Sequence, residues 1–318
     1  MVPANTPEPH RLLIGLGETL FDCFPDKQVL GGAPLNVAIH AHALLQAAGG
    51  AALPVTRIGD DDLGKQALES LRQRGLSTEW VQVDGDRPTG RVRVTLDKTR
   101  SAHYEFEKNS AWDAIAFTPE LAQLAARCDA VAFGTLAQRS PTSRETIQQF
   151  LQSATGAVRL FDVNLRQQYY DREILHASFN LASTAKVNEE ELRIVLNLVA
   201  DDAPEDNSLP DAAEQLRSLY DLDWLAVTRG PEGVALAIEN EWIEGKSVPL
   251  DAERHPEADT VGAGDACCAA LLVGTLQKLS TDQTLALANA CGAHVASQPG
   301  ATPSLPESIL RTATPSLE

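Results

Sequence analysis

Short apolar runs alternate along this chain with stretches in which apolar residues recur at helical spacing. The runs cover residues 12–16, 53–58, 130–133, 159–162, 185–187 and 224–228, and each predicts a β-strand. Helical spacing follows the first run, in NVAIHAHALLQAAGG at residues 36–50, and returns at residues 211–220. This alternation predicts an α/β fold, with a mainly parallel twisted sheet and helices on both of its faces.

One segment has a different period. In TGRVRVTLDKTRSAHYEFEKN, residues 89–109, apolar side chains at 92, 94 and 96 alternate with polar ones, as do those at 102, 104 and 106. A period of two predicts antiparallel strands with one face in water, set beside the main sheet. The pattern alone leaves open whether this ribbon is a lid or an edge hairpin.

The composition is that of a globular protein, since 43% of the 318 residues are hydrophobic. Lys and Arg number 26 against 44 Asp and Glu, which gives a formal net charge of −18. This charge repels a phosphate backbone or an anionic membrane surface, so we expect neither nucleic acid nor membrane as a partner. A small anion remains a candidate ligand, because backbone N–H groups bind one locally whatever the net charge.

The chain has no pattern typical of an exported or membrane-spanning protein. Its N-terminal MVPANTPEPHRLLIGLG lacks the features of a signal peptide, and nowhere do about 18 apolar residues run together. The five cysteines form no C-x-x-C and no zinc-like spacing with histidine, which favours reduced thiols. We therefore expect a cytoplasmic protein in which Cys267 and Cys268 serve packing.

Two glycine-containing segments come close to nucleotide-binding motifs but lack their chemistry. GDDDLGKQ, residues 59–66, has Gln66 where a phosphate loop needs a hydroxyl for magnesium, and three aspartates inside the loop. GLGETL, residues 15–20, follows a strand but has Leu20 in place of the third glycine of a dinucleotide fingerprint. We expect the first to be a loop that leads into a helix, and the second not to bind a nicotinamide or flavin cofactor.

DTVGAGDACCAALL, residues 259–272, combines glycines, a carboxylate and an apolar run. The glycines allow unusual backbone conformations, and the run that follows predicts a buried helix. At the start of that helix, the N–H groups of Gly262, Ala263, Gly264 and Asp265 are expected to form an anion pocket. From this segment alone, Asp265 is either a helix cap or a proton acceptor beside a bound phosphoryl group.

DTVGAGDA, residues 259–266, resembles the signature D-T-x-G-A-G-D of the ribokinase-like, PfkB-type carbohydrate kinases. Four more segments are similar to motifs of that family in the same order, namely GGAPLNVA, KVNEEEL, VTRGPEGVAL and LANACGAHVASQPGA. The resemblance covers nearly the whole chain. It implies a single ribokinase-like domain, residues 1–318, with lid strands from about residues 18–32 and 88–108, and ATP-dependent phosphorylation of a small hydroxylated substrate.

The resemblance also implies roles for individual residues. Asp265 would accept the hydroxyl proton, and the amides of Gly262, Ala263 and Gly264 would stabilise charge on the transferred phosphoryl group. The residues implied to hold the sugar are Asp22, Gly31, Gly32, Asn36 and Arg166. Those implied to bind ATP are Asn188, Thr228, Arg229, Gly230, Gly233 and Asn289. Glu191 would hold Mg²⁺ through water, and Asp259 would lie beside a monovalent cation such as K⁺.

Simpler interpretations of several of these residues stay open on the sequence alone. Asn36 is equally suited to capping a helix, and Arg166 to a surface ion pair. Residues 230–233 have the composition of a hairpin turn, and residues 189–191 that of an ordinary solvated helix start.

Four segments bear on the substrate. FDVNLR, residues 161–166, resembles both fructokinases and 2-keto-3-deoxygluconate kinases, and AWDAI and FGTLAQRS, at residues 111–115 and 133–140, resemble fructokinase sequences. GETLFD, residues 17–22, departs by one residue from the GELLxD that is usual near the start of such kinases. We therefore expect the conversion of D-fructose to fructose 6-phosphate. The alternatives are a kinase for 2-keto-3-deoxygluconate or another sugar, a nucleoside kinase, and a sugar-binding protein without catalysis. In relatives, lid ribbons often pair, so the resemblance also implies a homodimer.

Overall fold

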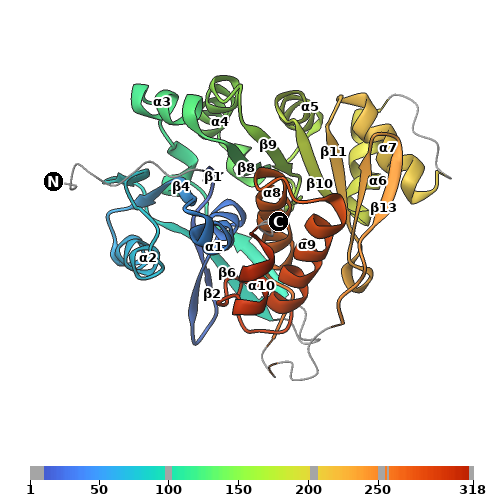
Figure 1. The fold of residues 1–318 in the computed structure, drawn as a ribbon. Coiled ribbons are helices and arrows are strands. Elements are labelled where there is room, and N and C mark those ends of the chain that lie inside the picture. Colours follow the sequence, from blue (N-terminus) through green and yellow to red (C-terminus); the bar gives the residue numbers. More distant parts are fainter. Residues whose placement is uncertain (1–10, 97–101, 201–206, 250–254, 256–257, 315–318) are drawn as a thin grey trace.

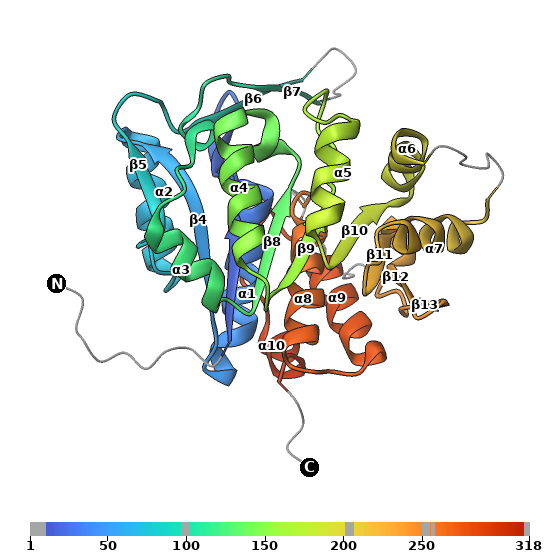
Figure 2. The same ribbon diagram turned by 90° about the horizontal axis from the view of Figure 1, so that it is seen from above.

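The computed structural model describes residues 11–96, 102–200, 207–249, 255 and 258–314. Its centre is a nine-stranded sheet with the order β13-β12-β11-β10-β9-β8-β1-β4-β5 (Figures 1 and 2). The bounds of its strands are β1 Leu12–Leu16, β4 Ala51–Gly59, β5 Val81–Asp84, β8 Ala130–Gly134, β9 Val158–Asp162, β10 Thr184–Asn188, β11 Trp224–Thr228, β12 Val234–Ile238 and β13 Glu241–Glu244.

The main sheet is parallel from β11 to β5, and only β12 and β13 pair in the antiparallel sense. All six strands predicted from apolar runs are present, and the mainly parallel sheet is confirmed. The run at residues 53–58 proved longer, because β4 continues at both ends to pair with its neighbours β1 and β5.

Helices cover both faces of the sheet (Figure 1). On one face lie α1 Ala33–Leu45, α2 Asp62–Gln73, α8 Ala263–Leu276, α9 Thr281–Val295 and α10 Glu307–Thr312. On the other lie α3 Pro119–Arg127, α4 Pro141–Ser153, α5 Arg172–Leu181, α6 Glu189–Val199 and α7 Leu209–Leu219. Helix α8 packs between α1 and α9, which places its N-terminus near the middle of the sheet.

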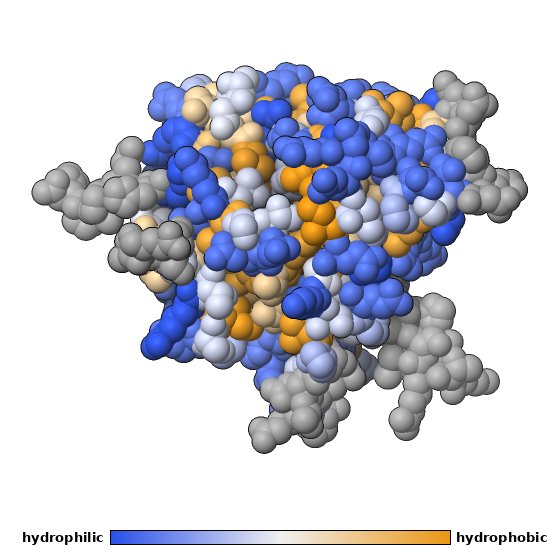
Figure 3. All heavy atoms as spheres, turned by 45° about the vertical axis from the view of Figure 1, so that its right-hand side comes forward, coloured by the Kyte–Doolittle hydropathy of each residue, from blue (hydrophilic) through white to orange (hydrophobic). Residues whose placement is uncertain are grey.

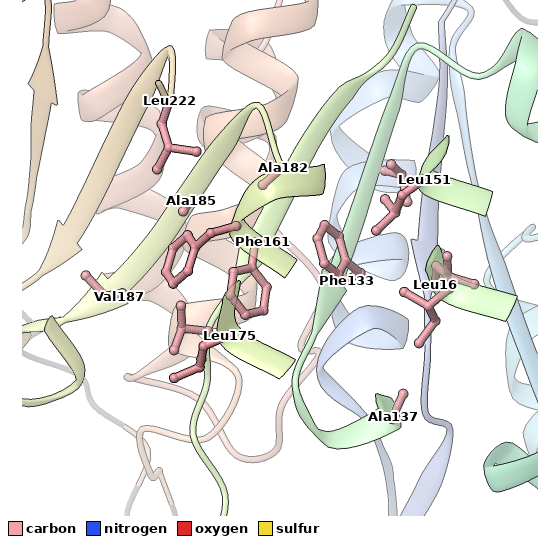
Figure 4. Packing of buried hydrophobic residues seen from close by; sticks show 14 of the residues in the cluster. Leu16, Phe133, Ala137, Leu151, Phe161, Leu175, Ala182, Ala185, Val187 and Leu222 are labelled. Atoms are coloured by element: carbon pink, nitrogen blue, oxygen red, sulfur yellow. The ribbon is translucent and has the colours of Figure 1, made fainter. Parts of the chain in front are cut away.

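Each face of the sheet has its own hydrophobic core. Successive side chains of a strand point to opposite faces, so Ile14 belongs to the core under α3 to α7 while its neighbour Leu13 belongs to the core under α1 and α8. In the first core, the rings of Phe133 and Phe161 stack at 5.2 Å between centroids (Figure 4). Burial on both faces explains why the strands read as continuous apolar runs.

A second sheet of four strands stands apart from the main one, in the order β3-β2-β6-β7. Its strands are β2 Leu20–Cys23, β3 Gln28–Gly31, β6 Gly90–Leu96 and β7 Ala102–Phe106, and β6 and β7 lie across one end of the main strands (Figure 2). The antiparallel ribbon predicted from period-two alternation is thus confirmed as β6 and β7. It is not an edge hairpin of the main sheet, because it pairs with β2.

The two rejected nucleotide motifs have ordinary structural roles. Asp61 caps α2 by accepting a hydrogen bond from the Gly64 N–H at 2.8 Å, as expected for a loop that leads into a helix. The segment after β1 runs into the extended strand β2 rather than into a helix. All five cysteines are free, and Cys267 and Cys268 are buried in α8, as predicted.

The surface in Figure 3 is mostly hydrophilic, with hydrophobic residues in small patches. Within the described part of the chain, no helix combines the length and the apolar character that a bilayer crossing requires.

Candidate active site

A cavity of about 1150 Å³ lies where the carboxyl ends of β9, β10 and β11 meet the small sheet. Asn188 and Thr228 line it from the ends of main strands, and Leu20, Val92 and Phe106 line it from the small sheet. Ligands of open α/β sheets bind at the carboxyl ends of the strands. Every predicted site residue except Arg229 lines this cavity.

The N-terminus of α8 opens into the cavity. Gly262 is its N-cap with a φ of 82°, and a Cβ there would lie 2.3 Å from the Ala301 carbonyl oxygen, so only glycine fits. Of the four N–H groups expected to form the anion pocket, that of Ala263 is already used by the preceding turn, because it donates to the Thr260 carbonyl at 3.2 Å. The N–H groups of Gly262, Gly264 and Asp265 have no acceptor among the described residues.

Asp265 lies in the first turn of α8 and is not its cap. One of its carboxylate oxygens accepts a hydrogen bond from the Asn36 side-chain amide at 2.7 Å, although the two residues are 229 positions apart. Burial, with the nearby charge of Asp162, raises the pKa of Asp265 to about 6, while Asn36, Lys186 and Arg166 oppose the rise. The carboxylate is therefore held in place and charged at neutral pH, as a proton acceptor must be.

Asn36 does not cap a helix either, because the N-cap of α1 is Gly32. The Asn36 side-chain oxygen is buried and has no hydrogen-bond partner among the described residues. Gly32 has a φ of 117°, and a Cβ on it would lie 2.3 Å from the Glu18 carbonyl oxygen. The glycine pair thus lets α1 begin close to β2, which brings Asn36 to Asp265.

Asp22 and Arg166 both line the cavity and interact electrostatically. Asp22 lies on β2 next to Gly31 of β3, where a Cβ would lie 3.2 Å from the Asp22 carboxylate. Burial raises the pKa of Asp22 to about 6, although Arg166 opposes this. Arg166 also lowers the pKa of Asp265, and it makes no ion pair with a surface carboxylate within the described ranges. The surface ion pair considered for it is therefore not observed.

Asn188 and Glu191 form a capping box at the start of α6. The Glu191 N–H donates to Asn188 at 2.8 Å, and the Asn188 N–H donates back to the Glu191 carboxylate at 2.8 Å. The other oxygen of Glu191 accepts from the Leu165 N–H at 2.9 Å. Glu191 is buried, unlike Glu189 and Glu190, so it is more than a solvated helix start. Its position ties the end of β10 to the segment after β9.

Residues 230–233 form a turn between the antiparallel strands β11 and β12, as their composition suggested, and Gly230, Pro231 and Gly233 of this turn also line the cavity. Gly233 has a φ of 88°, and a Cβ on it would lie 2.6 Å from the Asn289 side chain. Arg229 points elsewhere, since its guanidinium bonds Glu244 at 3.1 Å and Glu232 at 3.4 Å. The structure therefore does not bring Arg229 to the cavity with the other predicted residues.

Asn289 and Asp259 line the cavity with side chains that are already engaged. The Asn289 amide accepts from the Val234 N–H at 2.9 Å and donates to the Lys246 carbonyl at 3.0 Å. Asp259 is exposed and accepts from the Val261 N–H at 2.9 Å. Neither role was evident from the sequence, which gives no sign of contacts between distant segments.

Two charged residues at the site were missed. Lys186 of β10 bonds Asp162 of β9 at 2.9 Å, and the two are partners in the parallel register. A Cβ on Gly264 would lie 3.3 Å from the Lys186 ammonium, which places this cation beside the anion pocket. Burial is the largest single influence and disfavours the charge of Lys186, but Asp162, Cys268 and Glu191 together outweigh it and raise the pKa of Lys186. A lysine inside the apolar run TAKVN was the available signal.

Glu18 is the other residue missed, although it belongs to the quoted GETLFD. It is 3% exposed, lines the cavity, and accepts a hydrogen bond from the Ala33 N–H at 3.2 Å. Burial raises its pKa to about 7, and the charge of Asp265 adds to the rise. Only the fold reveals it, because the sequence does not show that the residue after β1 turns inward.

Known proteins resemble this chain over most of its length. The model of the pfkB family carbohydrate kinase matches residues 12–308. Fructokinase of Salmonella typhimurium is 28% identical to this chain, in an alignment that covers 92% of this chain and 95% of the relative. Fructokinase-1 of Oryza sativa subsp. japonica is 29% identical, and its alignment covers 94% of this chain and 95% of the relative.

Solved structures share the fold. Fructokinase with bound ATP from Xylella fastidiosa superposes with a TM-score of 0.78 at 21% identity, over 95% of this chain and 97% of that one. Fructokinase from Vibrio cholerae O395, in a form with bound fructose, ADP and calcium ion, superposes with a TM-score of 0.75 at 22% identity. The match covers 96% of this chain and 99% of that one. The predicted ribokinase-like α/β fold is thereby confirmed. Because the family model matches nearly the whole length of this chain, the chain belongs to the pfkB family of carbohydrate kinases.

Proposed function

We propose that this protein is an ATP-dependent fructokinase that forms fructose 6-phosphate from D-fructose. The observation that carries the proposal is the Asp265 carboxylate, which Asn36 holds at the cavity beside the unpaired N–H groups of Gly262 and Gly264. A proton acceptor and an anion pocket on the same helix turn are what the transfer of a phosphoryl group to an alcohol requires. Similarity to several fructokinases supports the choice of sugar.

In the proposed reaction a fructose hydroxyl oxygen attacks the terminal phosphorus of ATP, its proton passes to Asp265, and ADP leaves. The N–H groups of Gly262, Gly264 and Asp265 would stabilise the charge on the phosphoryl oxygens during transfer. Lys186, next to Gly264, adds a positive charge on the same side. The nucleotide itself would lie along Asn188, Thr228, Gly230 and Gly233, with its base toward Asn289.

Metal ions in this proposal come mainly with the nucleotide. The described residues contain no cluster of three His, Cys, Asp or Glu side chains that could hold a metal. Mg²⁺ commonly binds ATP phosphates with one or two carboxylates and several waters. Each oxygen of Glu191 accepts one backbone hydrogen bond and so keeps a lone pair for such a water. Asp259 is the proposed neighbour of K⁺.

The charges at the cavity favour a neutral sugar. Asp22, Asn36 and the backbone of Gly31 and Gly32 would bind hydroxyl groups, for which carboxylates and amides are well suited. Arg166 is the group that could recruit an acidic sugar such as 2-keto-3-deoxygluconate. The carboxyls of Asp22 and Asp265 already interact with it, so an added carboxylate would meet net repulsion.

A nucleoside kinase is the second candidate, and one observation favours it. Arg91 and Arg93 lie on β6, but the described side chains of β6 and β7 that line the cavity are the apolar Val92 and Phe106. An apolar lid accommodates a base as well as a sugar ring. The small sheet is in either case the proposed lid that excludes water during transfer.

A panel of acceptors tests the proposal. Purified protein with ATP and Mg²⁺ would receive D-fructose, 2-keto-3-deoxygluconate or adenosine, and ADP release would give kcat/KM for each. We expect D-fructose to exceed the others by at least about a hundred-fold, the scale on which unpaired polar groups reject a wrong substrate. A preference for adenosine or the acidic sugar would replace the proposed substrate, and no turnover with any would indicate a binding protein.

A further inference from the structure

Two buried carboxyl groups share a second, much smaller cavity behind the one described. Glu18 follows β1 and is 3% exposed, and Asp162 ends β9 and is 4% exposed. Both line this cavity of about 10 Å³, together with Thr135 and Asn164. A space of that size admits about one water molecule and nothing larger.

Each of the two carboxyl groups has one satisfied oxygen and one that lacks a donor. The satisfied oxygens accept from the Ala33 N–H at 3.2 Å and from the Lys186 ammonium at 2.9 Å. The second oxygens, Oε2 of Glu18 and Oδ2 of Asp162, are buried without a hydrogen-bond partner among the described residues. Two ionised carboxylates can only accept, so a proton on one of them would supply the missing donor.

The charges around Glu18 favour that proton. The negative charge of Asp265 on α8 raises the pKa of Glu18, while Asp162 of β9 lines the small cavity with it and Asp22 of β2 lines the large one. Arg166 opposes this rise, while Lys186 of β10 is already engaged by Asp162. Burial is the largest cause that raises the pKa of Glu18 to about 7, so near neutrality the acid and its anion are both populated.

We propose that Glu18 is a positioning residue of the phosphotransfer site that acts in its protonated form, with Oε2 donating toward Asp162 directly or through one water molecule. The proposal rests on the proposed kinase function. Protonated Glu18 joins two parts of the site: the start of α1, which carries Asn36 and so holds Asp265, and the Asp162–Lys186 pair beside Gly264.

Ionisation of Glu18 breaks this arrangement in two ways. The donor toward Asp162 is lost, and a negative charge is added beside Asp265, where the phosphates of ATP must come. Activity should therefore decline as Glu18 loses its proton. The rise of activity with the ionisation of Asp265 and the fall with that of Glu18 together give a bell-shaped profile.

The test compares pH profiles of kcat/KM for the wild-type enzyme and Glu18→Gln. Glutamine keeps an acceptor for the Ala33 N–H and a donor toward Asp162, but it does not titrate. We expect the wild-type profile to fall above about pH 7, by at least about ten-fold at pH 8.5, and the variant to keep its plateau. Glu69→Gln, at an exposed position on α2, is the matched control and should retain the wild-type fall.

A second measurement does not depend on turnover or on a folded variant. In ligand-free wild-type protein labelled with ¹³C at the glutamate carboxyl, one carboxyl should titrate between about pH 6 and 8. The proposal would be overturned if kcat/KM of Glu18→Gln still fell at alkaline pH as in the wild type. It would also be overturned if no glutamate carboxyl titrated in that range. If no acceptor is phosphorylated, the proposed function fails while the carbon titration still decides the protonation of Glu18.

Discussion

Asp265 has the position, the partner and the pKa that a proton acceptor needs. Asn36 donates to one of its oxygens at 2.7 Å, and burial raises its pKa to about 6. A stronger base would be protonated at neutral pH, and a weaker one would accept the proton less readily. The same burial makes the ionised residue costly to the fold, so function and stability conflict at this position.

That conflict gives a pH-dependent prediction. The ordinary pKa of an aspartate is near 3.8, and in the folded protein that of Asp265 is about 6. Between these values the native state holds a proton that the unfolded chain releases, so rising pH lowers the contribution of this group to stability. Asp265→Asn does not titrate. Its stability relative to wild type should therefore rise from pH 4 to pH 7, by up to about 3 kcal/mol. Calorimetric melting at several pH values measures this, and a constant difference would contradict it.

The buried pair of Lys186 and Asp162 supports the anion pocket. Removing one partner of such a pair leaves an unpaired buried charge, which costs about 3–5 kcal/mol. We expect Lys186→Met to lose stability on that scale in chemical unfolding. The double variant Lys186→Met/Asp162→Asn should recover much of the loss, because no charge is then left alone. Equal stability of the single and double variants would show that the pair is not coupled.

Among the elements, α8 carries the chemistry and its first turn depends on Gly262. The residue has a φ of 82°, and a Cβ would meet the Ala301 carbonyl oxygen at 2.3 Å. A non-glycine residue held in such a conformation costs about 1–3 kcal/mol. Either the loop at Ala301 or the start of the helix must then move, which displaces the N–H groups of the pocket.

We therefore predict that Gly262→Ala lowers kcat by about ten-fold or more while the chain still folds, since the loss of one donor or its alignment costs at least that much. Gly156→Ala is the matched control, because its Cβ would meet nothing within 4 Å and its φ is not positive. Steady-state kinetics and melting temperatures of both variants test the prediction. Equal kcat values in the two variants would show that the backbone conformation of Gly262 does not affect catalysis.

At the scale of the whole molecule, periodicity was sufficient to predict six strands of the main sheet, the helices α1 and α7 and the separate ribbon, but not the short strands β2, β3, β5, β12 and β13. Apolar runs gave the buried strands, because both faces of the sheet are covered. The resemblance of ordered motifs led to the correct family. Pattern could not show that Asn36 reaches Asp265 across 229 residues, or that Glu18 and Lys186 turn inward. The family resemblance also implied Arg229 at the nucleotide, whereas in the structure that side chain pairs with Glu232 and Glu244.

The assembly of the molecule remains a prediction from the family resemblance. We propose a homodimer in which the four-stranded sheets of two copies pair. One copy has a mass of 34.1 kDa. Light scattering coupled to size-exclusion chromatography should give about twice that mass, as a two-fold pair requires. A mass equal to one copy at micromolar concentration would contradict the dimer without affecting the site.

The central claim is that Asp265 takes the proton of the sugar hydroxyl, and Asp265→Asn tests it most directly. The amide keeps the shape and an acceptor for Asn36 but cannot serve as a base. We predict that calorimetric titration finds ATP binding close to that of wild type, while kcat with D-fructose falls by roughly two decades or more. Turnover near the wild-type value in a variant that binds ATP would remove Asp265 from the mechanism.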